Sequence, residues 1–208
     1  MQKTLTDKII LGTVQMGLPY GINNSEGKIS EMNSLKILNC AYERGVRFLD
    51  TADSYGNAHQ VIGKYHKSYP GKRFEIITKL PHKIESSIES LVHQYIEEMC
   101  VSKLNTLMFH SFDSYNEFYA KYKEEIIYLK SKESVVSFGV SVYTNEQIEI
   151  LLQDDTINTI QLPYNLLDNK NLRGNILAQI KASGKTVHTR SAFLQGLFFK
   201  PYNDTLNV

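Results

Sequence analysis

The fold is decided by residues 46–57, Val46-Arg-Phe-Leu-Asp-Thr-Ala-Asp-Ser-Tyr-Gly-Asn57, where a short apolar run leads into a polar turn. The run ends on Asp50, and Tyr55 follows five residues later in a turn that contains Gly and Asn. A short apolar run bounded by turn residues is typical of a buried strand. We therefore predict a strand that delivers a carboxylate and a phenol to one end of a sheet.

Similar apolar runs recur along the chain, with segments of helical period between them. The runs, which predict strands, occupy residues 9–17, 46–52, 74–80, 104–110, 136–143, 159–165 and 186–193. Helices are predicted at residues 31–44, 57–67, 83–100, 114–131, 145–153 and 169–182. The segment Thr144-Asn-Glu-Gln147 predicts a capping box, and Gly45 and Gly184 stand where helix C-caps are expected.

This alternation of strands and helices predicts parallel strands joined by right-handed crossovers in an α/β fold. The alternatives are an open doubly wound sheet and a (β/α)8 TIM barrel. No Gly-x-Gly-x-x-Gly follows the first strand and no Gly-x4-Gly-Lys-Ser/Thr occurs, which weakens the nucleotide-binding open sheets. Seven near-equal units favour the barrel.

A closed barrel needs eight strands and typically about 250 residues, whereas this sequence has 208 residues and seven predicted strands. We therefore expect residues 1–208 to form a single, incomplete α/β barrel domain that lacks the last βα unit. The first strand would then lack a neighbour, and self-association could cover that open edge.

Composition narrows the classes of partner. The 23 basic and 22 acidic residues give a formal charge of +1, so no global field attracts nucleic acid or an anionic membrane. Residues 1–8 lack the apolar run of a signal peptide, and no membrane span is predicted. The two cysteines indicate neither disulfides nor a metal knuckle, and the histidines outside the strand ends show no ligand spacing. We expect a cytoplasmic protein with a small-molecule partner and no metal.

In a barrel the active site lies at the carboxyl ends of the strands. Reading those ends in order gives Asp50, then Tyr55 in the following loop, then Lys79 and His110. Taken singly, each is more often a cap, a turn residue or a solvated strand end. Together they predict a site in which Tyr55 donates a proton, Lys79 lowers its pKa, Asp50 holds Lys79, and His110 orients a carbonyl.

Six motifs in this order resemble the aldo-keto reductases, in particular a bacterial branch associated with sugar and surface-polysaccharide genes. They are Asp50-Thr-Ala-Asp-Ser-Tyr-Gly56, Ile76-Ile-Thr-Lys79, Met108-Phe-His110, Gly139-Val-Ser141, Ile160-Gln161-x-x-Tyr164-Asn165 and Arg190-Ser-x-Phe-Leu-Gln-Gly-Leu197. The resemblance covers nearly the whole chain. It implies NADPH-dependent reduction of an aldehyde or ketone, with NADH as the alternative cofactor, and a catalytic set of Asp50, Tyr55, Lys79 and His110.

The same resemblance implies that Ser141, Gln161, Arg190 and Ser191 lie on the cofactor side. Two departures stand out: Val142 replaces the asparagine that commonly follows the family's serine, and Arg190 stands where an aromatic often stacks on the nicotinamide. The basic segment that binds the 2′-phosphate would lie beyond Val208.

Three functions are consistent with these features. The first is a reductase of a small carbonyl compound, sugar-derived ones included. The second is a shortened homologue with an intact catalytic set but impaired cofactor binding, serving as a non-catalytic scaffold. The third is a regulatory dinucleotide-binding subunit.

Overall fold

A computed structural model describes residues 5–200, and its strands and helices alternate along the chain. Residues 1–4 and 201–208, which include part of the N-terminal segment considered above and the end of the chain, lie outside the described residues. The strands are β1 (Ile10–Gly12), β2 (Phe48–Asp50), β3 (Glu75–Lys79), β4 (Leu104–Phe109), β5 (Val135–Ser141), β6 (Thr159–Pro163) and β7 (Thr186–Arg190). The helices are α1 (Val14–Gly17), α2 (Glu31–Glu43), α3 (Ala58–Ser68), α4 (Ile88–Met99), α5 (Phe112–Ser131), α6 (Asn145–Leu151) and α7 (Lys170–Ala182), with 3-10 turns η1 (Leu5–Lys8) and η2 (Leu194–Phe199).

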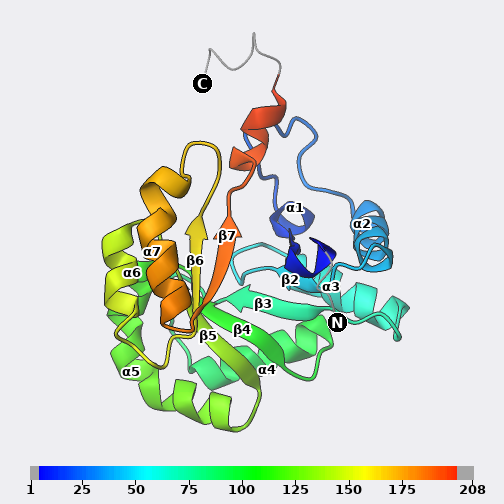
Figure 1. The fold of residues 1–208 in the computed structure, drawn as a ribbon. Coiled ribbons are helices and arrows are strands. Elements are labelled where there is room, and N and C mark those ends of the chain that lie inside the picture. The colour runs from blue at the N-terminus through cyan, green and yellow to red at the C-terminus, as the bar shows by residue number, and fades with distance from the viewer. Residues whose placement is uncertain (1–4, 201–208) are drawn as a thin grey trace.

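The seven strands form one parallel sheet in the order β1-β2-β3-β4-β5-β6-β7, as the barrel prediction requires (Figure 1). The sheet is curled. The side-chain amide of Gln161 on β6 lies 2.6 Å from the carboxylate of Asp50 on β2. In a flat sheet these two strands would stand about 19 Å apart, since neighbouring strands are spaced by about 4.8 Å. The doubly wound alternative is therefore wrong, and the fold is a curled (β/α) barrel without its last unit.

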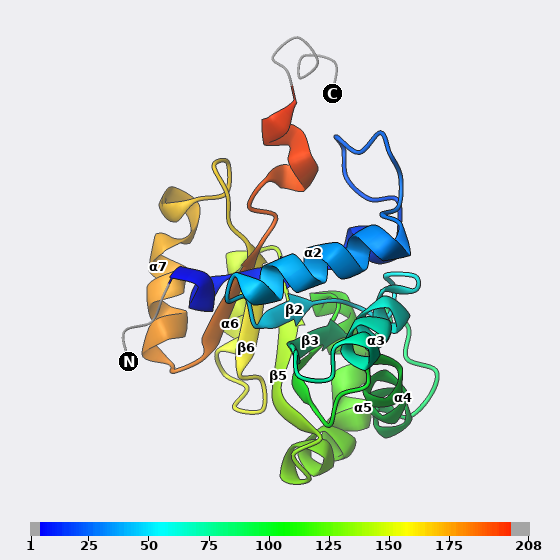
Figure 2. The ribbon, with the colours of Figure 1, turned by 90° about the vertical axis from the view of Figure 1, so that its right-hand side faces the viewer.

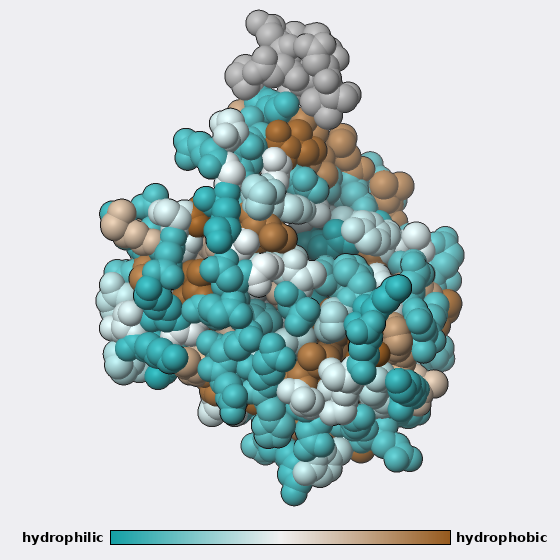
Figure 3. Space-filling view, turned by 180° about the vertical axis from the view of Figure 1, so that it is seen from behind, coloured by the Kyte–Doolittle hydropathy of each residue, from teal (hydrophilic) through white to brown (hydrophobic). Residues whose placement is uncertain are grey.

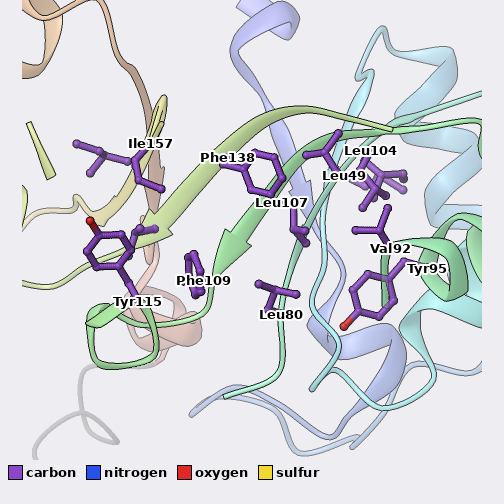
Figure 4. Packing of buried hydrophobic residues seen from close by; sticks show 14 of the residues in the cluster. Leu49, Leu80, Val92, Tyr95, Leu104, Leu107, Phe109, Tyr115, Phe138 and Ile157 are labelled. Carbon is purple, nitrogen blue, oxygen red and sulfur yellow. The ribbon is translucent and has the colours of Figure 1, made fainter. Parts of the chain in front are cut away.

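Helices cover the outside of the curled sheet, as the views in Figures 1 and 2 show. The contact between β4 and α5 is typical of this layer: the rings of Phe109 and Tyr115 meet edge to face with centroids 5.7 Å apart (Figure 4). Val92 and Tyr95 bring α4 into the same buried cluster. The large apolar side chains of this cluster thus lie between the sheet and the helices.

The two edge strands are less covered than the centre of the sheet. Every residue of β6 is buried, whereas β7 has none that is fully buried and β1 is half-exposed. Phe193 and Phe199, which flank or end η2, expose 61% and 66% of their surface. Figure 3 shows apolar surface at that end of the molecule. The open edge predicted from the strand count is therefore present in the described residues.

Several boundaries differ from the sequence-based expectation. The first predicted strand, residues 9–17, is strand only at Ile10–Gly12, because the chain turns into the short helix α1 at Val14. The segment 83–100 is helical only from Ile88, where the Ser87 side chain caps the helix. The capping box of Thr144 and Gln147 is confirmed. So are the left-handed C-cap positions at the two predicted glycines, whose φ angles are 89° and 75°.

Within residues 5–200, no helix is both long and apolar enough to cross a membrane. In the same described residues, no three His, Cys, Asp or Glu side chains are grouped closely enough to hold a metal ion.

Helices α3 and α4 pack closely at Gly63. A Cβ atom placed there would lie 1.9 Å from the backbone carbonyl oxygen of Glu98, a contact that the backbone can relieve only by moving. Gly174 in α7 is a contrasting helical glycine, whose nearest neighbour would be the flexible Lys170 side chain at 3.4 Å.

We predict that Gly63→Ala lowers the free energy of unfolding by about 1–3 kcal/mol, because overpacking forces the two helices apart. Gly174→Ala should be neutral or stabilising by up to about 1 kcal/mol, since alanine favours a helix. Urea denaturation of both variants measures this difference. Equal effects of the two substitutions would contradict the packing described for α3 and α4.

Candidate active site

The four predicted catalytic residues lie at the carboxyl ends of adjacent strands. Asp50 and Lys79 end β2 and β3, and His110 follows directly after β4. Tyr55 lies in the turn between β2 and α3. The Lys79 ammonium is 5.4 Å from the centre of the Tyr55 ring, and the rings of Tyr55 and His110 are 6.0 Å apart. The structure thus brings all four side chains together.

The Asp50 carboxylate is held from two sides. One oxygen accepts a hydrogen bond from the ammonium of Lys79, and the other accepts one from the Gln161 amide at 2.6 Å. Lys79 also donates to the carbonyl of Thr51 at 3.2 Å. The Lys79 side chain is only 3% exposed, so its charge depends on this carboxylate for compensation. The link between Asp50 and Gln161 was not predicted from the sequence.

Tyr55 is a neutral phenol at physiological pH. Burial raises the pKa of Tyr55 well above its usual value, and the neighbouring Asp50 carboxylate raises this pKa further. The guanidinium of Arg190 acts in the opposite direction but does not outweigh them. The expectation of a Tyr55 pKa below its usual value is therefore wrong for this arrangement, because burial and the Asp50 carboxylate raise the pKa.

The turn that carries Tyr55 packs closely against Gly17. A Cβ atom at Gly17 would lie only 1.7 Å from the backbone carbonyl oxygen of Tyr55. Gly56 approaches in return: its φ is 56°, and a Cβ atom there would lie 2.5 Å from the Gly17 carbonyl oxygen. This close approach of α1 to the turn fixes the Tyr55 backbone. Sequence reasoning missed Gly17, which stands in the segment predicted as strand.

His110 is also uncharged at neutral pH. Burial lowers its pKa to about 4, and the positive charge of Lys79 acts in the same direction. The Nδ1 atom of His110 lies 3.4 Å from the hydroxyl oxygen of Ser54. The His82 ring stacks on the His110 ring, with centroids 4.3 Å apart and planes inclined by 23°. Neither neighbour was singled out from the sequence.

The residues predicted on the cofactor side come from β5, β6 and β7: Ser141 and Arg190 end their strands, and Gln161 lies in the middle of β6. Arg190 donates from Nε to the Ser141 hydroxyl at 3.2 Å and from Nη1 to the Ser191 hydroxyl at 3.3 Å. Its guanidinium lies 4.2 Å from the centre of the Tyr143 ring. The Gln161 side-chain oxygen is buried and has no hydrogen-bond partner. This group of side chains can therefore receive a ligand that carries an N–H donor.

His188 lies beside the same site on β7, in register with Gln161. Its Nδ1 atom is buried and has no hydrogen-bond partner. Burial lowers the pKa of His188, while the nearby Asp50 carboxylate raises it. The sequence alone predicts an ordinary surface or core position for His188, and only the strand alternation could have indicated an inward-facing side chain.

Comparison with known proteins identifies the family. The model of the aldo/keto reductase family matches residues 8–208. The chain belongs to the aldo/keto reductase family. It is 25% identical over 187 residues to aldo-keto reductase YhdN of Bacillus subtilis, a match that covers 82% of this chain and 55% of that protein. It is 40% identical over 77 residues to the versiconal hemiacetal acetate reductase of Aspergillus parasiticus, which covers 35% of this chain and 21% of that protein.

Solved structures of other family members share the fold. An aldo-keto reductase of Bacillus halodurans in its holo form has a TM-score of 0.75 at 20% identity, covering 93% of this chain and 65% of that one. A reductase of Brucella melitensis has a TM-score of 0.68 at 17% identity, covering 89% of this chain and 68% of that one. This aldo/keto reductase spans about half the length of its curated relative from Bacillus subtilis.

We predict that the free energy of unfolding falls as the pH drops from about 6.5 to about 4, partly because of His110. The folded state holds this imidazole neutral down to a pKa of about 4, whereas in the unfolded chain it binds a proton near pH 6.5. Urea denaturation across this pH range gives the free energy of unfolding as a function of pH. This free energy should change less steeply with pH in His110→Asn than in the wild type, by an amount that corresponds to about one bound proton. His93→Asn, on the exposed face of α4, is the control. An unchanged slope in His110→Asn would contradict the neutral, half-buried imidazole.

Proposed function

We propose that the chain reduces an aldehyde or ketone to an alcohol with NADPH, with Tyr55 as the proton donor. The observation that carries this proposal is the convergence of Tyr55, Lys79, Asp50 and His110 at the carboxyl ends of adjacent strands. Membership of the aldo/keto reductase family supports the reaction class.

The protonation states suit a reduction. The raised pKa keeps the proton on the Tyr55 hydroxyl, where it can pass to a carbonyl oxygen as that oxygen gains negative charge. Neutral His110 can donate a second hydrogen bond to the same oxygen, which orients and polarises the carbonyl. Once Tyr55 has given up its proton, the Lys79 ammonium, 5.4 Å from the ring centre, favours the phenolate. Asp50 keeps Lys79 in place.

The residues on the cofactor side fit a nicotinamide carboxamide, which has both N–H donors and a carbonyl acceptor. The unpartnered oxygen of Gln161 would accept an N–H of the amide. The Ser141 hydroxyl would lie beside it, and Arg190 and Ser191 would line the neighbouring strand end. When bound, the dinucleotide supplies the hydride. NADPH is our proposal, with NADH as the alternative.

The proposed partner is a small carbonyl compound, sugar-derived compounds included, rather than nucleic acid or a membrane. The formal charge of +1 supports this choice, because it provides no strong field for polyanions. We further propose a cytoplasmic location, in line with two free cysteines. Self-association through the partly exposed strands β1 and β7 is part of the same proposal.

A second candidate is a homologue with this catalytic set but weak cofactor binding. The observation in its favour is the exposure of the edge strand β7, in which no residue is fully buried and which ends at Arg190 on the cofactor side. The two candidates differ in one measurable quantity, the affinity for NADPH. Micromolar binding by calorimetry supports the reductase, and no binding supports the second candidate.

We predict that the purified protein oxidises NADPH in a carbonyl-dependent reaction. The reaction is monitored, over a panel of aldehydes and ketones, as the loss of the near-ultraviolet absorbance of NADPH. Tyr55→Phe should lower kcat by about 100-fold or more while leaving NADPH affinity unchanged, since only the proton donor is removed. Tyr128→Phe, exposed on α5, is the matched control. Turnover by Tyr55→Phe at the wild-type rate would overturn the assignment of the donor.

A further inference from the structure

His110 has two neighbours that give its ring a defined environment. The Ser54 hydroxyl lies 3.4 Å from Nδ1, and the His82 ring stacks on the imidazole at 4.3 Å. Ser54 immediately precedes Tyr55 in the same turn. One residue of the turn therefore presents the phenol, and the residue before it contacts the imidazole.

The stack is anchored to the element that follows His110. The backbone carbonyl of His82 accepts a hydrogen bond from the Ser114 hydroxyl at 2.9 Å. Ser114 is 4% exposed and lies in the first turn of α5, where the Ser111 side chain caps the helix. The loop that carries His82 is therefore tied to the helix that begins two residues after His110. This hydrogen bond holds the loop of His82 in place, so the stacking of His82 on His110 is supported by the fold.

A neutral imidazole has two tautomers, and only the one with its proton on Nε2 can donate a hydrogen bond from Nε2 to a carbonyl oxygen. If the proton is on Nε2, Nδ1 is an acceptor and Nε2–H is a donor; in the other tautomer these roles are exchanged. The hydrogen bond made by one ring nitrogen decides which form is present. Among the described residues, the Ser54 hydroxyl is the only side chain within hydrogen-bond distance of Nδ1.

We propose that Ser54 and His82 are positioning residues for His110. The Ser54 hydroxyl donates to Nδ1 and so keeps the proton on Nε2, where it is available to the substrate carbonyl. The His82 ring fixes the plane in which that N–H points. This inference rests on the proposed carbonyl reduction for its purpose, but the tautomer itself is a property of the free protein.

The tautomer is measured by long-range ¹H–¹⁵N correlation spectra of the full chain labelled at histidine, with His110→Asn to assign the signals. We expect the wild-type spectrum to show a protonated Nε2 and an unprotonated Nδ1. Ser54→Ala should give a mixture of tautomers, and Ser54→Thr, which keeps the hydroxyl, should restore one form. Ser102→Ala, exposed in the loop before β4, should leave the spectrum unchanged.

The kinetic effect of these variants follows from the same role. Ser54→Ala should lower kcat by roughly fivefold, as expected for one lost hydrogen bond, with NADPH affinity unchanged. His82→Ala should lower kcat similarly, whereas His82→Phe, which keeps a flat ring for the stack, should restore most of it. Ser54 and His82 are exposed, so these variants are expected to fold.

A protonated Nδ1 in the wild-type protein would overturn the inference, as would an unchanged tautomer in Ser54→Ala. Failure of His82→Phe to recover activity relative to His82→Ala would overturn the role of the stack. If the wild-type protein reduces no carbonyl, the proposed function fails, while the spectra still decide whether Ser54 sets the His110 tautomer.

Discussion

The structure depends on the Asp50 carboxylate and its two hydrogen-bond partners. Lys79 holds one oxygen from the adjacent strand, and Gln161 holds the other from across the curled sheet. These contacts join β2, β3 and β6 on the inner face, where the ammonium of Lys79 is almost completely buried. The buried ammonium of Lys79 is stabilised by the nearby carboxylate of Asp50. That carboxylate is in turn stabilised by its two hydrogen-bond donors, Lys79 and Gln161. The curl of the sheet and the charge balance of its interior are thus coupled.

The chemistry of the site follows from that pairing. Burial and the charge of the Asp50 carboxylate both raise the pKa of Tyr55, so the phenol stays protonated. The charge of Lys79 helps to keep His110 neutral, with a pKa of about 4. Two neutral donors, Tyr55 in the turn after β2 and His110 after β4, are suited to a carbonyl oxygen, which gains negative charge during reduction.

The sequence was sufficient to predict the alternating units, the barrel and the four strand-end residues, because strand period, helix period and capping follow local rules. Contacts between residues far apart in the sequence could not be predicted from it. Nothing local indicates that Gln161 meets Asp50 across the barrel, or that His82 stacks on His110. The direction of the Tyr55 pKa shift was mispredicted because the sequence does not show how far Tyr55 is buried or how close the Asp50 carboxylate lies.

The most direct test of the Asp50–Lys79 pair is a double-mutant cycle, with free energies of unfolding measured in urea for Asp50→Asn, Lys79→Met and the double variant. We expect Asp50→Asn to cost about 3 kcal/mol, because it leaves a buried ammonium without its carboxylate. Adding Lys79→Met should recover much of that loss, which gives a large coupling free energy. Losses that simply add in the double variant would contradict the central role of this pair.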